Sequence, residues 1–101
     1  MNQLVRSSVF DEWLKDLQDK KGKARILARL DSAIAGNFGD CEPVGQGVSE
    51  MRVHYGPGYR VYFVRSGAST YVLLAGGDKG SQKRDINHAI EMARELRRTK
   101  K

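Results

Sequence analysis

The sequence predicts an α+β fold, in which an N-terminal helical hairpin and a C-terminal helix pack on a small antiparallel sheet. Three observations carry this prediction. Apolar residues repeat with helical spacing in the first third of the chain, alternate with polar residues in the middle, and return to helical spacing near the end. A chain of 101 residues has the length of one domain, so we expect residues 1–101 to form a single unit with the helices on one face of the sheet.

The helical segments are predicted by the spacing of their apolar residues. The first has an i, i+3, i+4, i+7 pattern made by Phe10, Trp13, Leu14 and Leu17. Ser7 or Ser8 can cap its N-terminus. A second helix runs from about Lys23 and ends at Gly36, so the two helices form a hairpin hinged at Gly22. A third helix is expected over residues 83–98, with an apolar face of Ile86, Ala89, Ile90 and Ala93.

Three strands are predicted in the second half of the chain, where apolar and polar residues alternate. They cover residues 48–55, 59–64 and 70–75. Glycine-containing turns at residues 56–58 and 66–68 separate them, which predicts an antiparallel meander. Residues 37–43 are rich in residue types that interrupt regular structure, so this segment is expected to be a loop.

The register of the first two strands can also be predicted, because a slip of one residue would exchange the two faces. Pairing Tyr55 with Tyr59 leaves one face apolar. The opposite face then carries a compact cluster of Arg52, His54, Arg60 and Tyr62. In this register His54 faces Arg60, and Arg52 faces Tyr62. Neighbouring like charges destabilise a sheet by roughly 0.2–1 kcal/mol, which favours a functional cluster; a solvated polar face is the alternative.

Positive charge is concentrated in the second half of the chain. Residues 1–51 carry seven Lys/Arg and eight Asp/Glu, a net of −1, whereas residues 52–101 carry eleven and four, a net of +7, which together give +6. This asymmetry indicates a polyanionic partner, because neutralisation of phosphates supplies most sequence-independent affinity for nucleic acids. Part of this charge is expected to be a solvated basic tail formed by Arg97, Arg98, Lys100 and Lys101.

A glycine-rich bend at residues 75–84 is a second candidate element of the site. It joins the third strand to the last helix and carries Lys79, Lys83 and Arg84. Backbone N–H groups at a helix N-terminus attract anions, so a phosphate can dock there; an ordinary strand-to-helix turn is the alternative. In a meander the third strand lies beside the second, so Lys79 and Lys83 are expected to reach the same face as Arg60.

Several other kinds of protein are disfavoured. The longest apolar run, about six residues around Val72, is far shorter than the roughly 18 needed to span a bilayer. No secretory signal is visible, so we expect a cytoplasmic protein. Cys41 is the single cysteine and cannot form an intramolecular disulfide. His54 and His88 are the only histidines, so we expect neither a metal site nor another cofactor.

Five segments of the chain resemble the RelE/ParE toxin superfamily, and within it the HigB-like addiction module killer proteins. They are FDEWL (10–14), GNFGD (36–40), VGQGVSEMR (44–52), GPGYRVYF (56–63) and LAGGDK (74–79). The resemblance implies a RelE-like fold with a short additional strand at residues 3–6. It further implies the toxin of a type II toxin–antitoxin system, a ribosome-assisted messenger-RNA endoribonuclease. The implied partners are a helix-turn-helix antitoxin, messenger RNA and the ribosome.

The same resemblance assigns roles to individual residues. Arg60 matches the arginine of the Gly-Tyr-Arg motif, which contacts the scissile phosphate in RelE-like toxins. Arg52 lies where these toxins place a catalytic lysine, and Lys79 lies near their basic residue after the third strand. The tyrosine that RelE carries at the start of its last helix has no counterpart here, because Asp85 and Ile86 occupy that stretch.

These matches predict a metal-independent reaction in which the ribose 2′-hydroxyl attacks the adjacent phosphate. Arg60, Arg52 and Lys79 are expected to stabilise the developing negative charge. His54 is expected to transfer a proton, because imidazole titrates near neutral pH. The predicted RNA-binding residues are Tyr62, Lys83 and Arg84. Two alternatives are a ParE-like DNA gyrase poison without nuclease activity and a noncatalytic nucleic-acid binder.

Overall fold

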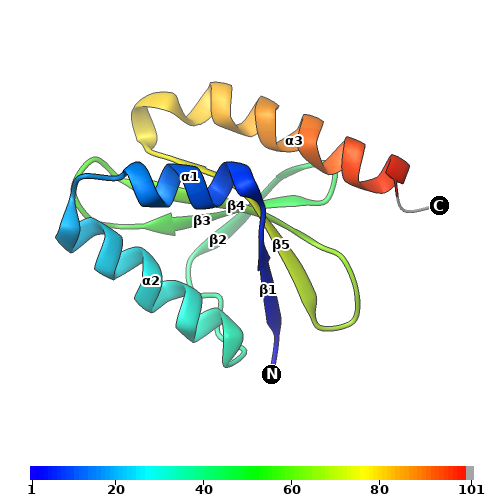
Figure 1. Cartoon of the computed structure of the whole chain (residues 1–101), viewed down its shortest axis with the longest axis horizontal. Coiled ribbons are helices and arrows are strands. Elements are labelled where there is room, and N and C mark those ends of the chain that lie inside the picture. Colours follow the sequence, from blue (N-terminus) through cyan, green and yellow to red (C-terminus); the bar gives the residue numbers. More distant parts are fainter. Residues whose placement is uncertain (100–101) are drawn as a thin grey trace.

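The computed structural model describes residues 1–99 and confirms the α+β class (Figure 1). Lys100 and Lys101, expected in the basic tail, lie outside the described residues. In chain order the elements are β1 (Gln3–Arg6), α1 (Ser8–Asp16), α2 (Lys20–Ile34), β2 (Cys41–Gly45), β3 (Val48–Val53), β4 (Tyr59–Arg65), β5 (Thr70–Gly77), the 3-10 turn η1 (Lys79–Ser81) and α3 (Gln82–Thr99).

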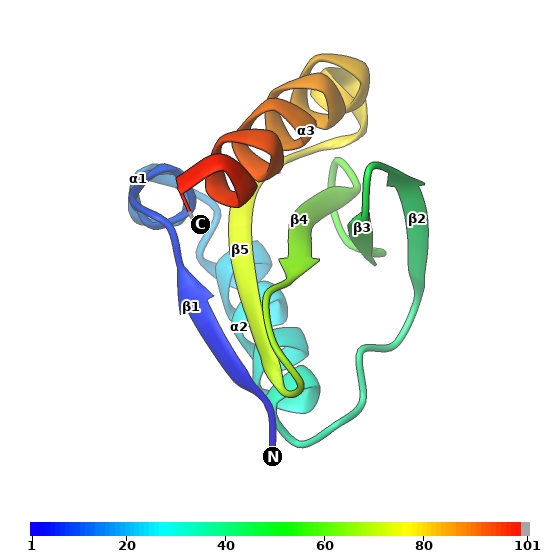
Figure 2. The same cartoon turned by 90° about the vertical axis from the view of Figure 1, so that its right-hand side faces the viewer.

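The strands form one sheet in the order β1-β5-β4-β3-β2 (Figure 2). The antiparallel meander of β3, β4 and β5 is confirmed, and β1 is the short additional strand. Because β1 pairs in parallel with β5, the sheet is mixed. The prediction of a loop at residues 37–43 is wrong in its last part, since β2 begins at Cys41. Pro43 is tolerated because β2 is an edge strand, whose outer side needs no backbone donor.

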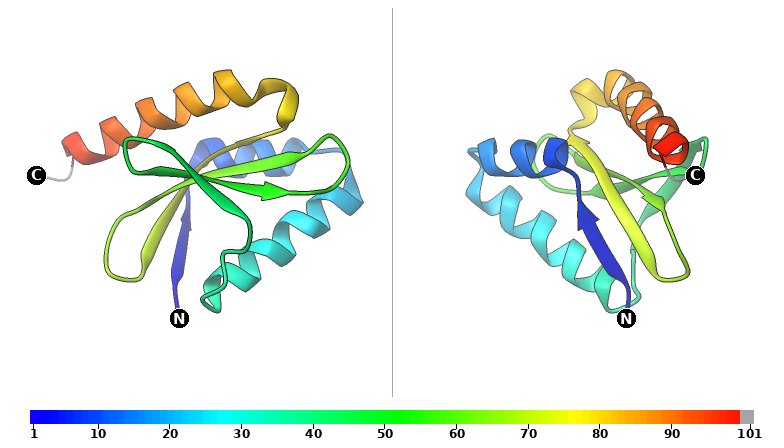
Figure 3. Two further views of the ribbon diagram at one scale, coloured as in Figure 1. Left: turned by 180° about the vertical axis from the view of Figure 1, so that it is seen from behind. Right: turned by 45° about the vertical axis from the view of Figure 1, so that its right-hand side comes forward.

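Helices cover both faces of the sheet, which corrects the expectation that they share one face (Figure 3). α1 and α2 contribute Phe10, Leu14, Ile26 and Leu30 to the core on one side. On the other side, Ala89 and Ala93 of α3 pack against the sheet, and their small side chains let the helix approach closely. β4 is buried along residues 59–64 as a result. Its alternating pattern predicted one solvated face, but α3 covers part of that face.

The register between β3 and β4 differs by two residues from the predicted one. Val53 pairs with Tyr59, and Arg52 pairs directly with Arg60. The strands separate earlier than expected because β3 ends at Val53, and the connection contains two glycines with positive φ, Gly56 and Gly58. A shift of two preserves the faces, so the arginines remain on the predicted side. His54, however, leaves the sheet and does not face Arg60.

The helical hairpin turns at Asp19 rather than at Gly22. The Asp19 side chain caps α2 by accepting a hydrogen bond from the Gly22 amide, which places Gly22 inside the first turn. Gly22 is needed for close packing, because a Cβ there would come within 2.5 Å of the Tyr59 ring. The Tyr59 hydroxyl donates a hydrogen bond of 2.7 Å to Asp19. The hairpin is therefore attached to the start of β4, where the site begins.

Candidate active site

All four predicted catalytic side chains lie around one open hollow of about 430 Å³. It is lined by Arg52, His54, Tyr55, Gly56, Pro57, Gly58, Arg60 and Lys79. The arginines come from the facing ends of β3 and β4, His54 comes from the loop that connects those strands, and Lys79 comes from η1. The structure thus brings together two segments that lie about twenty residues apart in the sequence.

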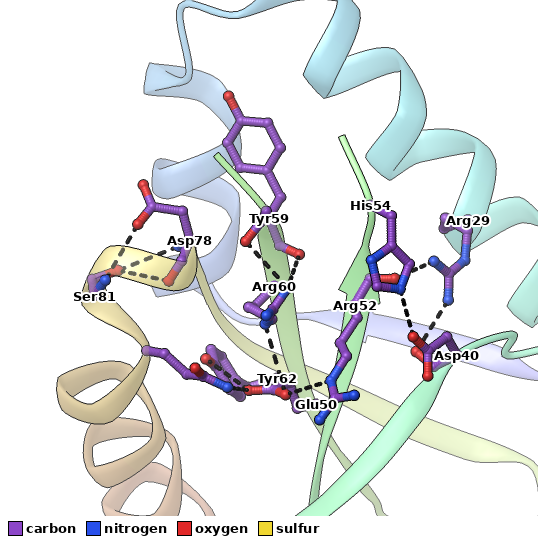
Figure 4. A network of polar contacts seen from close by, with 12 residues as sticks. Arg29, Asp40, Glu50, Arg52, His54, Tyr59, Arg60, Tyr62, Asp78 and Ser81 are labelled. Carbon is purple, nitrogen blue, oxygen red and sulfur yellow. Dashed lines mark hydrogen bonds and ion pairs between the residues drawn. The ribbon is translucent and has the colours of Figure 1, made fainter. Parts of the chain in front are cut away.

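A buried carboxylate, Glu50, lies beside this hollow and contacts both arginines (Figure 4). Its Oε2 is 3.1 Å from Arg52 Nε and 3.7 Å from Arg60 Nε. Its Oε1 accepts hydrogen bonds from Gln82 Nε2 at 2.7 Å and from the Tyr62 hydroxyl at 3.3 Å. Glu50 is only 1% exposed. Glu50 is not among the residues predicted for the site, although its alternation with Arg52 on β3 already put both side chains on one face.

Arg60 is held in place by the sheet and by the turn before it. It is 8% exposed, and its Nη1 donates hydrogen bonds to the carbonyls of Gly58 and Tyr59 at 3.3 and 3.5 Å. Its Nε is buried and forms no hydrogen bond within residues 1–99, although it forms the ion pair with Glu50. A guanidinium removed from water attracts an anion more strongly than an exposed one, because solvent screens it less. Arg60 is therefore a preoriented cation.

Arg52 is more accessible, with about a third of its side chain exposed. The hydrogen bond with Glu50 is the main cause that raises the pKa of Arg52 above its ordinary value, so the guanidinium stays charged. Its backbone is also fixed, because its N–H donates to the Asp40 carbonyl and its carbonyl accepts from Arg29 Nη1. Arg29 projects from α2, so the helical hairpin supports this end of β3.

His54 is exposed and is paired with a carboxylate. Its Nε2 lies 2.6 Å from Asp40 Oδ2, and this contact is the largest of the effects that lower the pKa of Asp40. Asp40 precedes β2, and Arg29 Nη2 holds that segment by donating to the Phe38 and Asp40 carbonyls at 2.9 and 3.4 Å. A ring whose one nitrogen is oriented by a carboxylate has the arrangement of a general base and its orienting group.

The remaining basic residues predicted for the site line two different hollows. Lys79 is exposed beside the first hollow, where its backbone N–H donates to the Pro57 carbonyl at 3.4 Å. Lys83 and Arg84 are also exposed, but they line a second hollow of about 690 Å³ at the start of α3. The expectation that Lys83 joins Lys79 at the face of Arg60 is therefore not met.

Tyr62 is not on an exposed face, contrary to the prediction. Its side chain is fully buried between β4 and α3, and burial is the largest of the effects that raise its pKa. A ring in this position cannot stack on a base at the surface. Its hydroxyl instead donates to Glu50, so the aromatic side chain stabilises the carboxylate that contacts the arginines.

Two backbone amides of the glycine-rich bend donate to a side chain of the protein itself. Asp78 Oδ1 accepts hydrogen bonds from the amides of Gly80 at 2.9 Å and Ser81 at 3.2 Å. Ser81 Oγ also donates to Asp85 Oδ2 at 2.5 Å. The bend is thus a capped strand-to-helix turn in this structure, which is the ordinary turn that the sequence offered as the alternative.

Within residues 1–99, no helix is long and apolar enough to cross a membrane. No group of three or more His, Cys, Asp or Glu side chains in the same range is arranged to hold a metal ion. Cys41 is a free thiol whose pKa is raised by burial, and its Sγ donates to the Phe38 carbonyl at 3.4 Å.

The mixed sheet, the helical hairpin, the C-terminal helix and the basic hollow define a small α+β protein compatible with a RelE-like fold. The chain belongs to the phage-derived Gp49-like protein family (DUF891), whose profile matches residues 12–98. This family is a member of the RelE/ParE-like toxin superfamily. An uncharacterized protein of Haemophilus influenzae is 42% identical over 94 residues, which cover 93% of this chain and 95% of that relative.

Proposed function

We propose that this protein is the toxin of a type II toxin–antitoxin system, and that it is a HigB-like, ribosome-assisted endoribonuclease that cuts messenger RNA. Family membership supports the toxin class. The observation that carries the nuclease proposal is the single hollow shared by Arg52, Arg60, Lys79 and His54. Cleavage of RNA by an internal hydroxyl needs cations at the phosphate and a group that accepts a proton, and this hollow offers both.

The proposed reaction begins when the ribose 2′-oxygen attacks the adjacent phosphorus. The bond from phosphorus to the 5′-oxygen of the next nucleotide breaks, which leaves a 2′,3′-cyclic phosphate and a 5′-hydroxyl. Arg60 stabilises the negative charge that builds on the nonbridging oxygens, because a guanidinium can bind two oxygens through parallel N–H donors. Arg52 and Lys79 supply the remaining positive charge.

His54 is the proposed proton acceptor. With Nε2 bonded to Asp40, Nδ1 is left to remove the proton from the 2′-hydroxyl, since it forms no hydrogen bond within residues 1–99. Asp40 holds the ring in one orientation and stabilises the imidazolium that forms. The leaving 5′-oxygen takes up a proton, and no side chain is assigned to that step. Lys83 and Arg84 are proposed to bind the RNA backbone beside the second hollow.

The proposed partners follow from this activity. A helix-turn-helix antitoxin silences the toxin by covering or distorting the cationic hollow, or by blocking its access to the ribosome. The net charge of +6 favours association with the polyanionic ribosome and messenger RNA. Because messages and ribosomes are in the cytoplasm, the protein acts there.

The test is to map the ends of cellular transcripts by primer extension after brief expression of the protein. Cuts that follow the reading frame are expected for a nuclease that acts during translation. Intact messages accompanied by broken DNA would contradict the nuclease proposal and indicate a gyrase poison instead. A variant with Arg60→Ala serves as the control, because loss of the proposed phosphate-binding residue removes the cuts.

A further inference from the structure

We propose that Glu50 is a positioning residue of this site, which holds Arg52 and Arg60 in the orientation that the phosphate requires. The inference rests on the proposed function, since it concerns the same hollow. It goes beyond the proposed catalytic residues, because Glu50 does not line the hollow itself. Its carboxylate lies behind the arginines and contacts both of them.

The charges around Glu50 explain why such a residue is needed. Arg52 and Arg60 are direct cross-strand partners, and like charges in that relation destabilise a sheet. A carboxylate in contact with both guanidinium groups offsets this repulsion, because it attracts each of them. For Arg60 the contact matters more, because its buried Nε has no other polar partner within residues 1–99. A buried cationic donor without an anion beside it would be costly.

Glu50 is itself held by neutral groups from two other elements. The Tyr62 hydroxyl of β4 and Gln82 Nε2 at the start of α3 both donate to Oε1, which leaves Oε2 for the arginines. The two oxygens of the carboxylate therefore bind different groups. Oε1 anchors the side chain to β4 and α3, and Oε2 orients the two cations.

This arrangement indicates positioning rather than proton transfer. Glu50 is 1% exposed and both of its oxygens are occupied, so a ribose hydroxyl cannot reach it without displacing Arg52 or Arg60. His54, in contrast, is an exposed group on the rim of the hollow. A positioning role predicts a particular kinetic signature, because removing the negative charge leaves the cations present but no longer oriented.

The proposed experiment compares Glu50→Gln and Glu50→Asp with Glu12→Gln. Glutamine keeps an oxygen that can accept from Tyr62 and Gln82 but removes the charge. Glu12 is the control, because it lies on α1, is exposed, and forms no hydrogen bond or ion pair within residues 1–99. Three quantities are measured: cleavage of a defined message on ribosomes, affinity for a short RNA with a 2′-deoxy nucleotide at the cut position, and the arginine Nε–H signals in NMR spectra.

For Glu50→Gln we expect kcat to fall about tenfold or more, since a displacement of about 1 Å can cost a hundredfold in rate. KM and the affinity for the uncleavable RNA stay equal or improve, because the hollow has lost a negative charge. The Nε–H signals of Arg52 and Arg60 move toward those of exposed arginines. Glu50→Asp, which keeps the charge, recovers part of the rate, and Glu12→Gln behaves as the unchanged protein.

Either of two results on activity and stability would overturn the proposal. One is an unchanged kcat in Glu50→Gln. The other is a parallel loss of rate, affinity and melting temperature in both Glu50 variants, which would indicate a purely structural role. The NMR signals separate this inference from the proposed function. If the unchanged protein cuts no message, the nuclease proposal fails, and unshifted Arg52 and Arg60 signals in the variants would independently show that Glu50 does not hold them.

Discussion

Arg52 and Arg60 are paired directly across β3 and β4, so two positive charges lie side by side in a sheet that is otherwise mostly apolar at its centre. Stability alone does not favour such a pair. It is tolerated here because Glu50 contacts both guanidinium groups. Groups that are unfavourable for folding but are kept by a surrounding network are typical of functional sites.

The Arg60→Ala variant is expected to lose growth inhibition almost completely. Folding should persist, because Glu50 keeps its contacts with Arg52, Tyr62 and Gln82, and the loss of one partner costs about 1–3 kcal/mol. Growth after induction and thermal unfolding are measured in parallel. Arg65→Ala is the control, since it removes an exposed cation at the end of the same strand. Full toxicity of a folded Arg60→Ala protein would show that the site is assigned wrongly.

RNA affinity should fall steeply as salt is added. Contacts of phosphates with Arg52, Arg60, Lys79, Lys83 and Arg84 predict a slope of log K on log salt of about −3.5, at about −0.7 for each contact on a single strand. Lys79→Ala should reduce the slope by about 0.7, whereas Lys15→Ala, on a different hollow, should leave it unchanged. Titration of a fluorescent RNA at several salt concentrations measures both. A slope near zero would contradict binding dominated by phosphates.

The chemical ends of the cleavage products should identify the group that attacks the phosphate. The upstream fragment is expected to end in a cyclic or 3′-phosphate, and a message with a 2′-deoxy nucleotide at the cut position should resist cleavage. Activity should survive EDTA under conditions that keep ribosomes intact, because protein cations are proposed to stabilise the charge. End-group analysis of the fragments tests this. A 3′-hydroxyl end, or efficient cutting of the deoxy-substituted message, would refute the mechanism.

Stability should depend on Asp19 at acidic pH. The Gly22 amide first, and then the Tyr59 hydroxyl, hold the pKa of Asp19 below its ordinary value of 3.8. The folded state therefore disfavours the protonated form, so the stabilisation is present above about pH 4 and is lost as pH falls through the lowered pKa. Asp19→Asn should lower the melting temperature at pH 7, and its difference from the unchanged protein should shrink toward pH 2.

The control for this series is Asp16→Asn, because the Asp16 carboxylate is exposed and forms no hydrogen bond or ion pair within residues 1–99. Melting curves by circular dichroism from pH 2 to pH 7 provide the comparison. If the melting temperatures of Asp19→Asn and the unchanged protein differed by the same amount at every pH, the cap formed by Asp19 would not titrate as expected.

Local patterns in the sequence predicted most of the helices and strands, and they predicted the positions of some site residues but not of others. The periodicity of apolar residues predicted three helices and the β3–β4–β5 meander, because these repeats depend only on which side chains face a core. Alternation also placed Arg52 and Arg60 on one face. It failed for Tyr62, since polar neighbours predicted a solvated face and a helix more than twenty residues later covers it. β2 was missed because a five-residue edge strand containing a proline has little periodic signal.

The sequence by itself determined the α+β class, the faces of the hairpin and the concentration of positive charge in the second half of the chain. These properties follow from local spacing and from counting charges. Only the tertiary structure decided the exact pairing of Arg52 with Arg60, the capping of the bend by Asp78 and the burial of Glu50. The physical reason is that pairing and burial minimise the free energy of the whole chain. They depend on turn geometry and on the helix that closes over the sheet, which short-range patterns do not contain.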